Sequence, residues 1–126
     1  MALTPKQVEE MHGKMLHKRL YIIFSEPTEK TGDRRKIFPK HIEYQLKIEK
    51  AGILFAAGPF VDAKGKPQGP GMIVIRAKNM AEAQRVAEND PFHKQGFRKF
   101  RIQAWDVNEG GFNLHVRFSD GSFTLD

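Results

Sequence analysis

The sequence has no cysteine and no long apolar run, and each absence removes a class of protein from consideration. Without cysteine there is no disulfide framework, no thiolate metal ligand and no thiol nucleophile. The longest apolar stretches, at residues 20–24 and 71–75, are far too short to cross a bilayer, which takes about 20 residues. The first 20 residues carry acids and lysines in place of a secretory apolar core. We therefore expect a cytoplasmic protein with no membrane partner.

The composition is that of an ordinary globular domain, with 40% apolar and 29% charged residues in a chain of 126. We expect a single domain over residues 1–126, with a core at 19–108, an N-terminal helix within 1–18 and a hairpin extension over 109–126. The net charge of +6 suggests nucleic acid as a partner, but Lys and Arg are scattered along the chain. That scatter favours a solvated surface, or an anionic small molecule as ligand.

The hydrophobic pattern predicts the order strand, helix, strand, strand, helix, strand, after a first helix that Thr4 caps. Strands are expected at 19–25, 53–60, 72–77 and 97–107, and helices at 4–18, 39–50 and 80–89. Pro39 should open the first core helix, with Phe38, Ile42 and Leu46 as its apolar stripe. Residues 62–71, DAKGKPQGPG, predict a loop, and residues 112–125 a hairpin with a turn at 120–121. This order indicates an α+β protein with a ferredoxin-like βαββαβ core.

Both alternating sets of side chains in the first core strands are apolar, and this predicts a partner. In the first strand Leu20, Ile22 and Phe24 alternate with Tyr21 and Ile23. The two helices can cover one face of the sheet, but the other face needs a second surface. The hairpin's apolar stripe needs a docking place as well, since a lone two-stranded hairpin is marginal in water. We expect a homodimer or a higher homo-oligomer.

The topology gathers a few chemically capable residues at one end of the sheet. Right-handed crossovers place the start of helix 39–50, the end of the second strand and the end of helix 80–89 together. His41 is the histidine at that end, and Asp90 is the carboxylate held there by Pro91. A helix N-terminus disfavours imidazolium, so a neutral His41 oriented by Asp90 could accept a proton. The alternative is structural, with His41 half-buried and Asp90 only ending a helix.

Three segments resemble the YCII-related (YciI-like) family, which is similar in fold to the dimeric α+β-barrel group. They are PKHIEYQLKIEKAGILFAAGPF, GMIVIRA and AEAQRVAENDPF, and the resemblance covers roughly residues 19–108 without the N-terminal helix or the tail hairpin. The resemblance implies that His41 and Asp90 form the family's active-site pair. It also implies that Gly58, Pro59 and Phe92 help to form the pocket. The family is similar to enzymes of aromatic-compound breakdown, including a dehydrochlorinase that acts on a chlorinated hydroxyquinol and muconolactone isomerases.

The function that these observations favour is acid/base chemistry of the lyase, isomerase or hydrolase type on a small anionic or phenolic compound. His41 would act as general base or acid, Asp90 would orient and charge it, and Phe60 with Phe92 would wall an apolar pocket. A basic rim would attract a carboxylate or phenolate, from Lys40, Lys64 or Arg35.

No metal or cofactor is expected. His12 and His17 are five residues apart and point to different helix faces, while His93 and His115 lack partner ligands. Haem bound through the helix histidine would require the neighbouring carboxylate to be out of the way.

Two other classes share this fold. RNA-recognition domains stack bases on aromatic residues of the first and third strands, but here the third strand reads GMIVIRA and has no aromatic residue. Nucleic acid is therefore not expected as a partner. The remaining alternative to an enzyme is a non-catalytic dimeric module that holds or senses a small molecule in the same pocket.

Overall fold

The computed structural model describes residues 2–126 and divides into two compact units. The first, the core unit, is Arg19–Asp106. The second, the terminal unit, combines the two ends of the chain, Met1–Lys18 and Val107–Asp126. The expectation of one domain over the whole chain stays a prediction.

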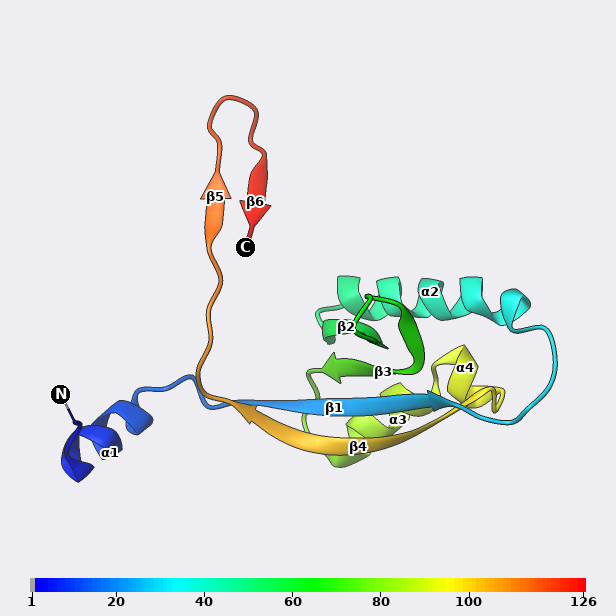
Figure 1. Cartoon of the computed structure of the whole chain (residues 1–126), viewed down its shortest axis with the longest axis horizontal. Helices are drawn as coiled ribbons and strands as arrows, with labels where there is room; N and C mark the ends of the chain where they lie inside the picture. The colour runs from blue at the N-terminus through cyan, green and yellow to red at the C-terminus, as the bar shows by residue number, and fades with distance from the viewer. Residues whose placement is uncertain (1) are drawn as a thin grey trace. The chain divides into compact units, whose positions relative to one another are not determined.

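The core unit is built on a four-stranded sheet in the order β2-β3-β1-β4 (Figure 1). Its elements are β1 (Lys18–Pro27), α2 (Arg34–Lys50), β2 (Leu54–Val61), β3 (Pro67–Ile75), α3 (Met80–Glu88), α4 (Pro91–Lys94) and β4 (Arg98–Val107). Strand β3 pairs antiparallel with both β1 and β2. The sheet order and the alternation of strands and helices confirm the predicted ferredoxin-like βαββαβ core of an α+β protein.

The main hydrophobic core lies between the sheet and the two long helices. Tyr21 and Ile23 of β1 are buried with Ile73 and Ile75 of β3, and Ile48, Ala83 and Ala87 come from the helices. Because successive strand residues point to opposite faces, these odd-numbered positions define the helix-facing side of β1 and β3. In β4 the matching side-chain set is Phe100, Ile102 and Ala104, which pack against the same cluster.

Helix α2 begins at Arg34, and the prediction that Pro39 opens it is wrong. Asp33 caps the helix, because its Oδ1 accepts the N–H of Arg35 at 3.0 Å. The Arg34 guanidinium ties this start to the sheet by donating to the carbonyl oxygen of Thr28 at 2.9 Å. His41 therefore lies about two turns into the helix, beyond the reach of the N-terminal dipole.

The predicted apolar stripe of α2 is also wrong. Phe38, Ile42 and Leu46 are 53%, 39% and 57% exposed. The face that packs inward follows the spacing i, i+4, i+7, i+11, at Ile37, His41, Tyr44 and Ile48. Apolar residues occupy both faces of this helix, so the periodicity alone did not select the face that the sheet would cover.

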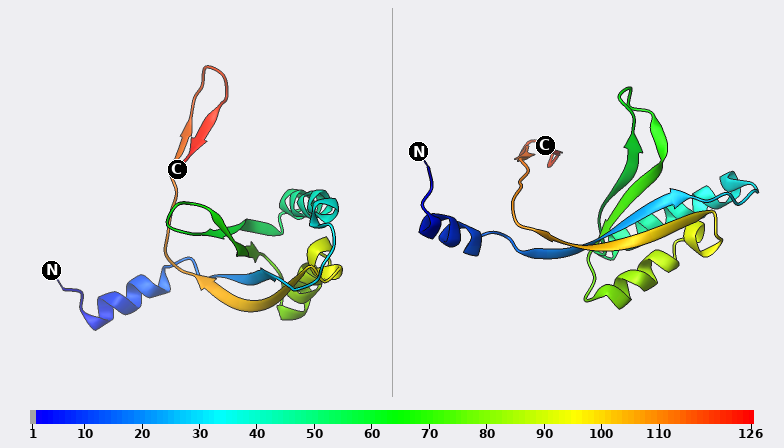
Figure 2. Two further views of the ribbon diagram at one scale, coloured as in Figure 1. Left: turned by 45° about the vertical axis from the view of Figure 1, so that its right-hand side comes forward. Right: turned by 60° about the horizontal axis from the view of Figure 1, so that its bottom comes forward.

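Strand β3 starts earlier than expected, because residues 67–71 pair with β2 and do not form a loop. The Asp62 carboxylate closes the turn by accepting the N–H groups of Lys64 and Lys66 at 2.9 and 3.0 Å. Within the strand, Gly71 leaves room for β2, since a Cβ there would lie 2.9 Å from the carbonyl oxygen of Gly58. The outer part of the β2–β3 hairpin extends away from the β1–β4 pair (Figure 2, right).

The terminal unit contains a helix and the predicted hairpin. Helix α1 (Pro5–Gly13) starts with a capping box between Thr4 and Gln7 and ends at Gly13, short of the expected residue 18. Strands β5 (Leu114–Val116) and β6 (Phe123–Leu125) pair antiparallel. The hairpin's apolar side chains are exposed, Phe118 at 98%. No helix within residues 2–126 has both the length and the apolar character needed to cross a membrane.

Two neighbouring positions test the orientation of α2. Ile48→Ala, at a side chain that is 4% exposed, should lower the free energy of unfolding by about 2–5 kcal/mol because it leaves a cavity. Leu46→Ala, at a side chain that is 57% exposed, should cost well under about 1 kcal/mol. Urea unfolding of both variants measures the difference. Equal losses would mean that the described face assignment is wrong.

Candidate active site

His41 and Asp90 are in direct contact. The Nδ1 atom of His41 lies 2.9 and 2.8 Å from the two carboxylate oxygens of Asp90. Helix α2 carries the histidine, while the aspartate lies between α3 and α4. Residues 49 positions apart thus meet, at the end of the sheet where the topology predicted them.

Asp90 is held in place by its own backbone. Pro91 follows it, and Asp90 adopts an extended conformation with φ −63° and ψ 126°. Its Oδ1 accepts the N–H of Phe92 at 3.0 Å and so caps the single turn of α4, an element that the sequence reasoning missed. Gln45 of α2 donates its Nε2 to the other carboxylate oxygen at 3.1 Å. With His41, three donors therefore orient a side chain that is only 2% exposed.

These donors keep Asp90 ionised. Burial by itself would raise the pKa of this carboxyl group, since it disfavours the charged form. The hydrogen bond from His41, the positive charge of that ring when it is protonated, and the N–H of Phe92 outweigh burial and leave the pKa of Asp90 below its ordinary value. An ionised carboxylate can only accept, so Nδ1 of His41 donates to it.

That assignment determines what His41 offers to a ligand. In the neutral form of His41, a proton on Nδ1 leaves the second ring nitrogen, Nε2, with a free lone pair. The Phe92 ring packs on the imidazole with ring centroids 4.8 Å apart, and Phe38 lies 6.3 Å away. The histidine side chain is 19% exposed, so it is accessible at a wall formed by aromatic rings.

His41 lines a cavity of about 880 Å³ between α2 and the strands. The wall residues are Ser25, Phe38, His41, Ile42, Gln45, Glu49, Leu54, Phe55, Ala56, Ala57, Gly58, Pro59, Pro67, Gly69, Gly71, Met72, Ile73, Phe92 and Arg98. Most of these side chains are apolar. A volume near the upper end of ordinary ligand pockets accommodates a small organic molecule with room to spare.

The structure brings some of the expected site residues together and leaves others apart. Gly58, Pro59 and Phe92 line the cavity with His41, and Asp90 lies behind the histidine. Phe60 lines a separate cavity of about 430 Å³.

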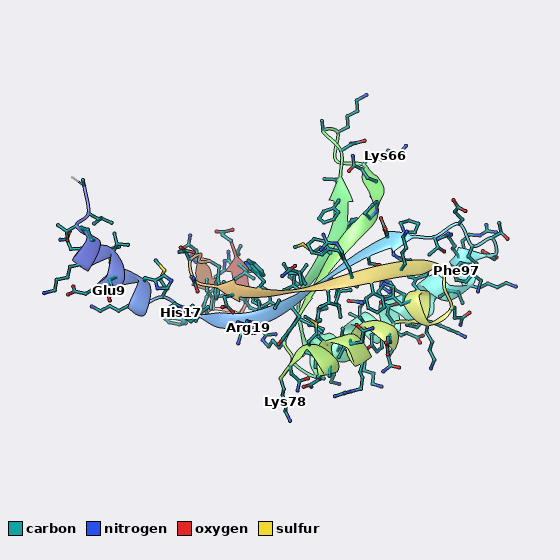
Figure 3. The ribbon with its side chains drawn as sticks, turned by 90° about the horizontal axis from the view of Figure 1, so that it is seen from below. Glu9, His17, Arg19, Lys66, Lys78 and Phe97 are labelled. Carbon is teal, nitrogen blue, oxygen red and sulfur yellow. The ribbon has the colours of Figure 1, made fainter. Side chains whose placement is uncertain are left out.

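The predicted basic rim is not part of the cavity wall. Lys40 is exposed and lines neither cavity, and Arg35 is directed to Asp33 at 3.1 Å. Lys64 and Lys66 lie in the turn of the β2–β3 hairpin, where Figure 3 marks Lys66 at the tip.

The cation of the cavity is Arg98, which the sequence reasoning missed. Its Nε donates to the Ser25 hydroxyl at 2.8 Å, and its Nη2 donates to the carbonyl oxygens of Ser25 and Gly69 at 3.0 and 2.7 Å. Ser25 continues the buried set of β1 after Tyr21 and Ile23, and Arg98 precedes Phe100 in the same set of β4. A polar residue in an otherwise apolar alternating set was the signal that could have identified both.

A second histidine completes this polar group. His93 Nδ1 lies 2.7 Å from the carbonyl oxygen of Ala87, and Nε2 lies 2.7 Å from the Ser25 hydroxyl. A carbonyl can only accept, so Nδ1 carries the proton and Ser25 donates to Nε2. Burial lowers the pKa of His93 below its ordinary value, which keeps this ring neutral at pH 7.

Two further observations bear on ligands. No group of three or more His, Cys, Asp or Glu side chains in residues 2–126 is arranged to hold a metal ion. The Oε1 atom of Gln45 is buried with no hydrogen-bond partner in the described chain, although Gln45 lines the cavity.

Comparison with known proteins agrees with this architecture. A family model described as the YCII-related domain matches residues 19–106. Among solved structures, the 5-chloro-2-hydroxyhydroquinone dehydrochlorinase of Burkholderia phenoliruptrix, in complex with 2,5-dihydroxybenzoquinone, aligns with a TM-score of 0.55 at 21% identity. The alignment covers 68% of this chain and 92% of that chain, and at this identity it shows the fold alone. No curated protein matches the chain.

The stability that Asp90 contributes should depend on pH. A lowered pKa in the folded state means that the unfolded chain binds the proton more readily, so the contribution is present above the unfolded value, 3.8, and is lost as pH falls through the folded value. Asp90→Asn should therefore lower the free energy of unfolding by about 1–3 kcal/mol at pH 7, and by less below about pH 4.

Urea titrations of both proteins between neutral and acid pH measure this difference. Glu43→Gln, at an exposed carboxylate on the same helix as His41, is the control and should change little. A difference between Asp90→Asn and the original protein that stays constant with pH would contradict an ionised Asp90.

Proposed function

The chain belongs to the YCII-related family over residues 19–106, and from this premise we propose that it is an enzyme. The proposed activity is acid/base chemistry on a small phenolic or anionic compound, with His41 as the proton-transfer group. One observation carries the proposal. The Nδ1 atom of His41 is hydrogen-bonded to a buried carboxylate, and the same side chain lines a cavity whose wall is mostly apolar.

The two side chains have different parts in this proposal. Nε2 of His41 accepts a proton from a hydroxyl group or an acidic carbon of the substrate. Asp90 stabilises the imidazolium that forms and keeps the ring in the tautomer that can accept a proton. Since the donors to Asp90 hold its pKa low, the proton stays on the histidine and can be returned to the product.

The cavity supports an aromatic compound as substrate. Phe38 and Phe92 provide flat apolar walls for an aromatic ring. The structural neighbour is a dehydrochlorinase of a hydroxyhydroquinone and was solved with a dihydroxybenzoquinone, which suggests the same class of compound here.

Elimination from a hydroxylated ring is the reaction that this arrangement serves most directly. His41 would move the proton of one ring hydroxyl to the ring carbon that bears the leaving group, which forms a C=O bond. Loss of the proton from a second ring hydroxyl would then form a second C=O bond and expel the leaving group with its electron pair. Isomerisation would use the same histidine to remove and return a proton. Neither reaction changes the oxidation state of a protein group. The proposed reactions include no cofactor. The cytoplasmic location of the protein stays a prediction from the sequence.

The test is turnover of 5-chloro-2-hydroxyhydroquinone as the first substrate, measured by the chloride that is released. His41→Gln should lower kcat about 10²–10⁴-fold, because it removes the proton acceptor and keeps a similar shape. His115→Gln, in the exposed β5–β6 hairpin, is the matched control and should retain full activity.

Binding measured alongside turnover separates the enzyme from a binding module. Titration with 2,5-dihydroxybenzoquinone should give similar affinities for the original protein and His41→Gln. Full turnover in His41→Gln would overturn the assigned role. Tight binding of phenolic compounds with no turnover in either protein would favour the non-catalytic small-molecule module.

We also propose that the protein is a homodimer. Strand β2 is at the edge of the sheet, and its side chains Phe55, Phe60 and Val61 are exposed. An exposed apolar edge strand is unfavourable in water and prone to association, and a second copy of the chain would cover it.

Light scattering should therefore give twice the chain mass of 14.4 kDa. Val61→Glu should shift the mass toward the monomer by placing a charge at the edge strand. Val8→Glu, at a comparably exposed valine of α1, is the control and should leave the mass unchanged. A monomeric mass for the original protein at micromolar concentration would contradict the proposal.

A further inference from the structure

Arg98 is a half-buried cation without an anionic partner. It lines the cavity that contains His41, and none of its hydrogen bonds goes to a carboxylate. Within residues 2–126 no Asp or Glu forms an ion pair with it. The negative charges of Asp90 and Glu26 act on it from a distance, but Asp90 is bonded to His41 and Glu26 is paired with Lys99 at 3.4 Å. A guanidinium that is partly removed from water without a counter-charge is costly, so its environment favours an added anion.

The hydrogen bonds of Arg98 leave a definite part of the group free. A guanidinium has five N–H donors. One on Nε goes to the Ser25 hydroxyl, and Nη2 serves the carbonyl oxygens of Ser25 and Gly69. The Nη1 atom has no hydrogen-bond partner among the described residues. The protein therefore holds the Nε and Nη2 atoms of the guanidinium and leaves Nη1 available to a ligand.

The residues around Arg98 fix it without cancelling its charge. The proton of the neutral His93 ring is on Nδ1, which donates it to the carbonyl oxygen of Ala87. The Ser25 hydroxyl therefore donates its own proton to Nε2 of His93. Ser25 can then only accept from Arg98. His93 is neutral, since burial lowers its pKa, and Arg34 adds a second positive charge nearby. Ser25 and His93 are thus positioning residues for a cation that no carboxylate contacts directly.

We propose that Arg98 binds an anionic oxygen of the compound in the cavity, a carboxylate or a phenolate. This inference rests on the proposed function and narrows its substrate class. The substrate would carry the anionic oxygen at Nη1 of Arg98 and the proton to be transferred near Nε2 of His41. An N–H donor to a charged oxygen makes a strong hydrogen bond, which fixes the orientation of the ring relative to the histidine.

The test compares anions with neutral molecules of the same shape, by calorimetric titration of the full chain. The original protein should bind benzoate about 10–100-fold more tightly than benzamide. Arg98→Met should abolish that preference. Lys99→Met removes the same charge one residue away on β4 and should preserve it, because Lys99 does not line this cavity. Equal affinities of the original protein for benzoate and benzamide, together with no lowering of the pKa of bound 4-nitrophenol in the measurement below, would overturn the proposal.

A second measurement needs no variant, which matters if Arg98→Met fails to fold. 4-Nitrophenol turns yellow when it ionises, so its absorbance reports the pKa of the bound phenol. Binding to Arg98 should lower that pKa relative to the free phenol. A preference for benzoate alone or for 4-nitrophenolate alone would support the anionic site and identify which oxygen it takes.

His41→Gln separates this inference from the proposed function. The variant should keep the preference for the anion and lose turnover. If His41→Gln keeps both the preference for the anion and full turnover, Arg98 is an anion site and the proposed role of His41 is wrong. If the original protein turns over a phenolic substrate but shows no preference for the anion, the proton-transfer role stands and the Arg98 site is wrong.

Discussion

The buried carboxylate of Asp90 connects more of this fold than any other single group. It follows the end of α3, caps α4 through the N–H of Phe92, and accepts hydrogen bonds from His41 and Gln45 of α2. A charge that is 2% exposed is tolerable only because all of these donors converge on it. The same donors define the chemistry, because they keep the carboxylate ionised and determine which nitrogen of His41 remains free.

A second polar group shapes the cavity by a different means. Ser25 and Arg98 occupy positions on β1 and β4 where the alternation of the core would place apolar side chains. Their hydrogen bonds with each other, with His93 and with backbone carbonyls satisfy most of their polar atoms. The core is therefore interrupted at one end of the sheet, and the cavity lies at that interruption. At this end of the sheet, polar side chains take positions where apolar side chains would otherwise pack. The apolar packing of the core is provided by the cluster around Ile23 and Ile75.

The differences between the predicted and observed elements share a cause. Pro39 is a strong local signal for a helix start, but the Asp33 cap and the Arg34 contact with Thr28 extend the helix by a turn and more. Likewise, residues 67–71 are rich in glycine and proline, yet Asp62 closes the turn early enough for them to pair with β2. In both places a side chain that satisfies backbone groups outweighed the local propensity.

The sequence by itself determined the order of strands and helices, because the period of apolar residues and the punctuation by Gly and Pro are local properties. With the right-handed crossover rule, that order also placed His41 and Asp90 at one end of the sheet. Only the tertiary structure decided which face of α2 is buried, which cation enters the cavity and which ring nitrogen of His41 is free. Each of these depends on contacts between residues far apart in the chain, such as Arg98 with Ser25, and no local pattern encodes them.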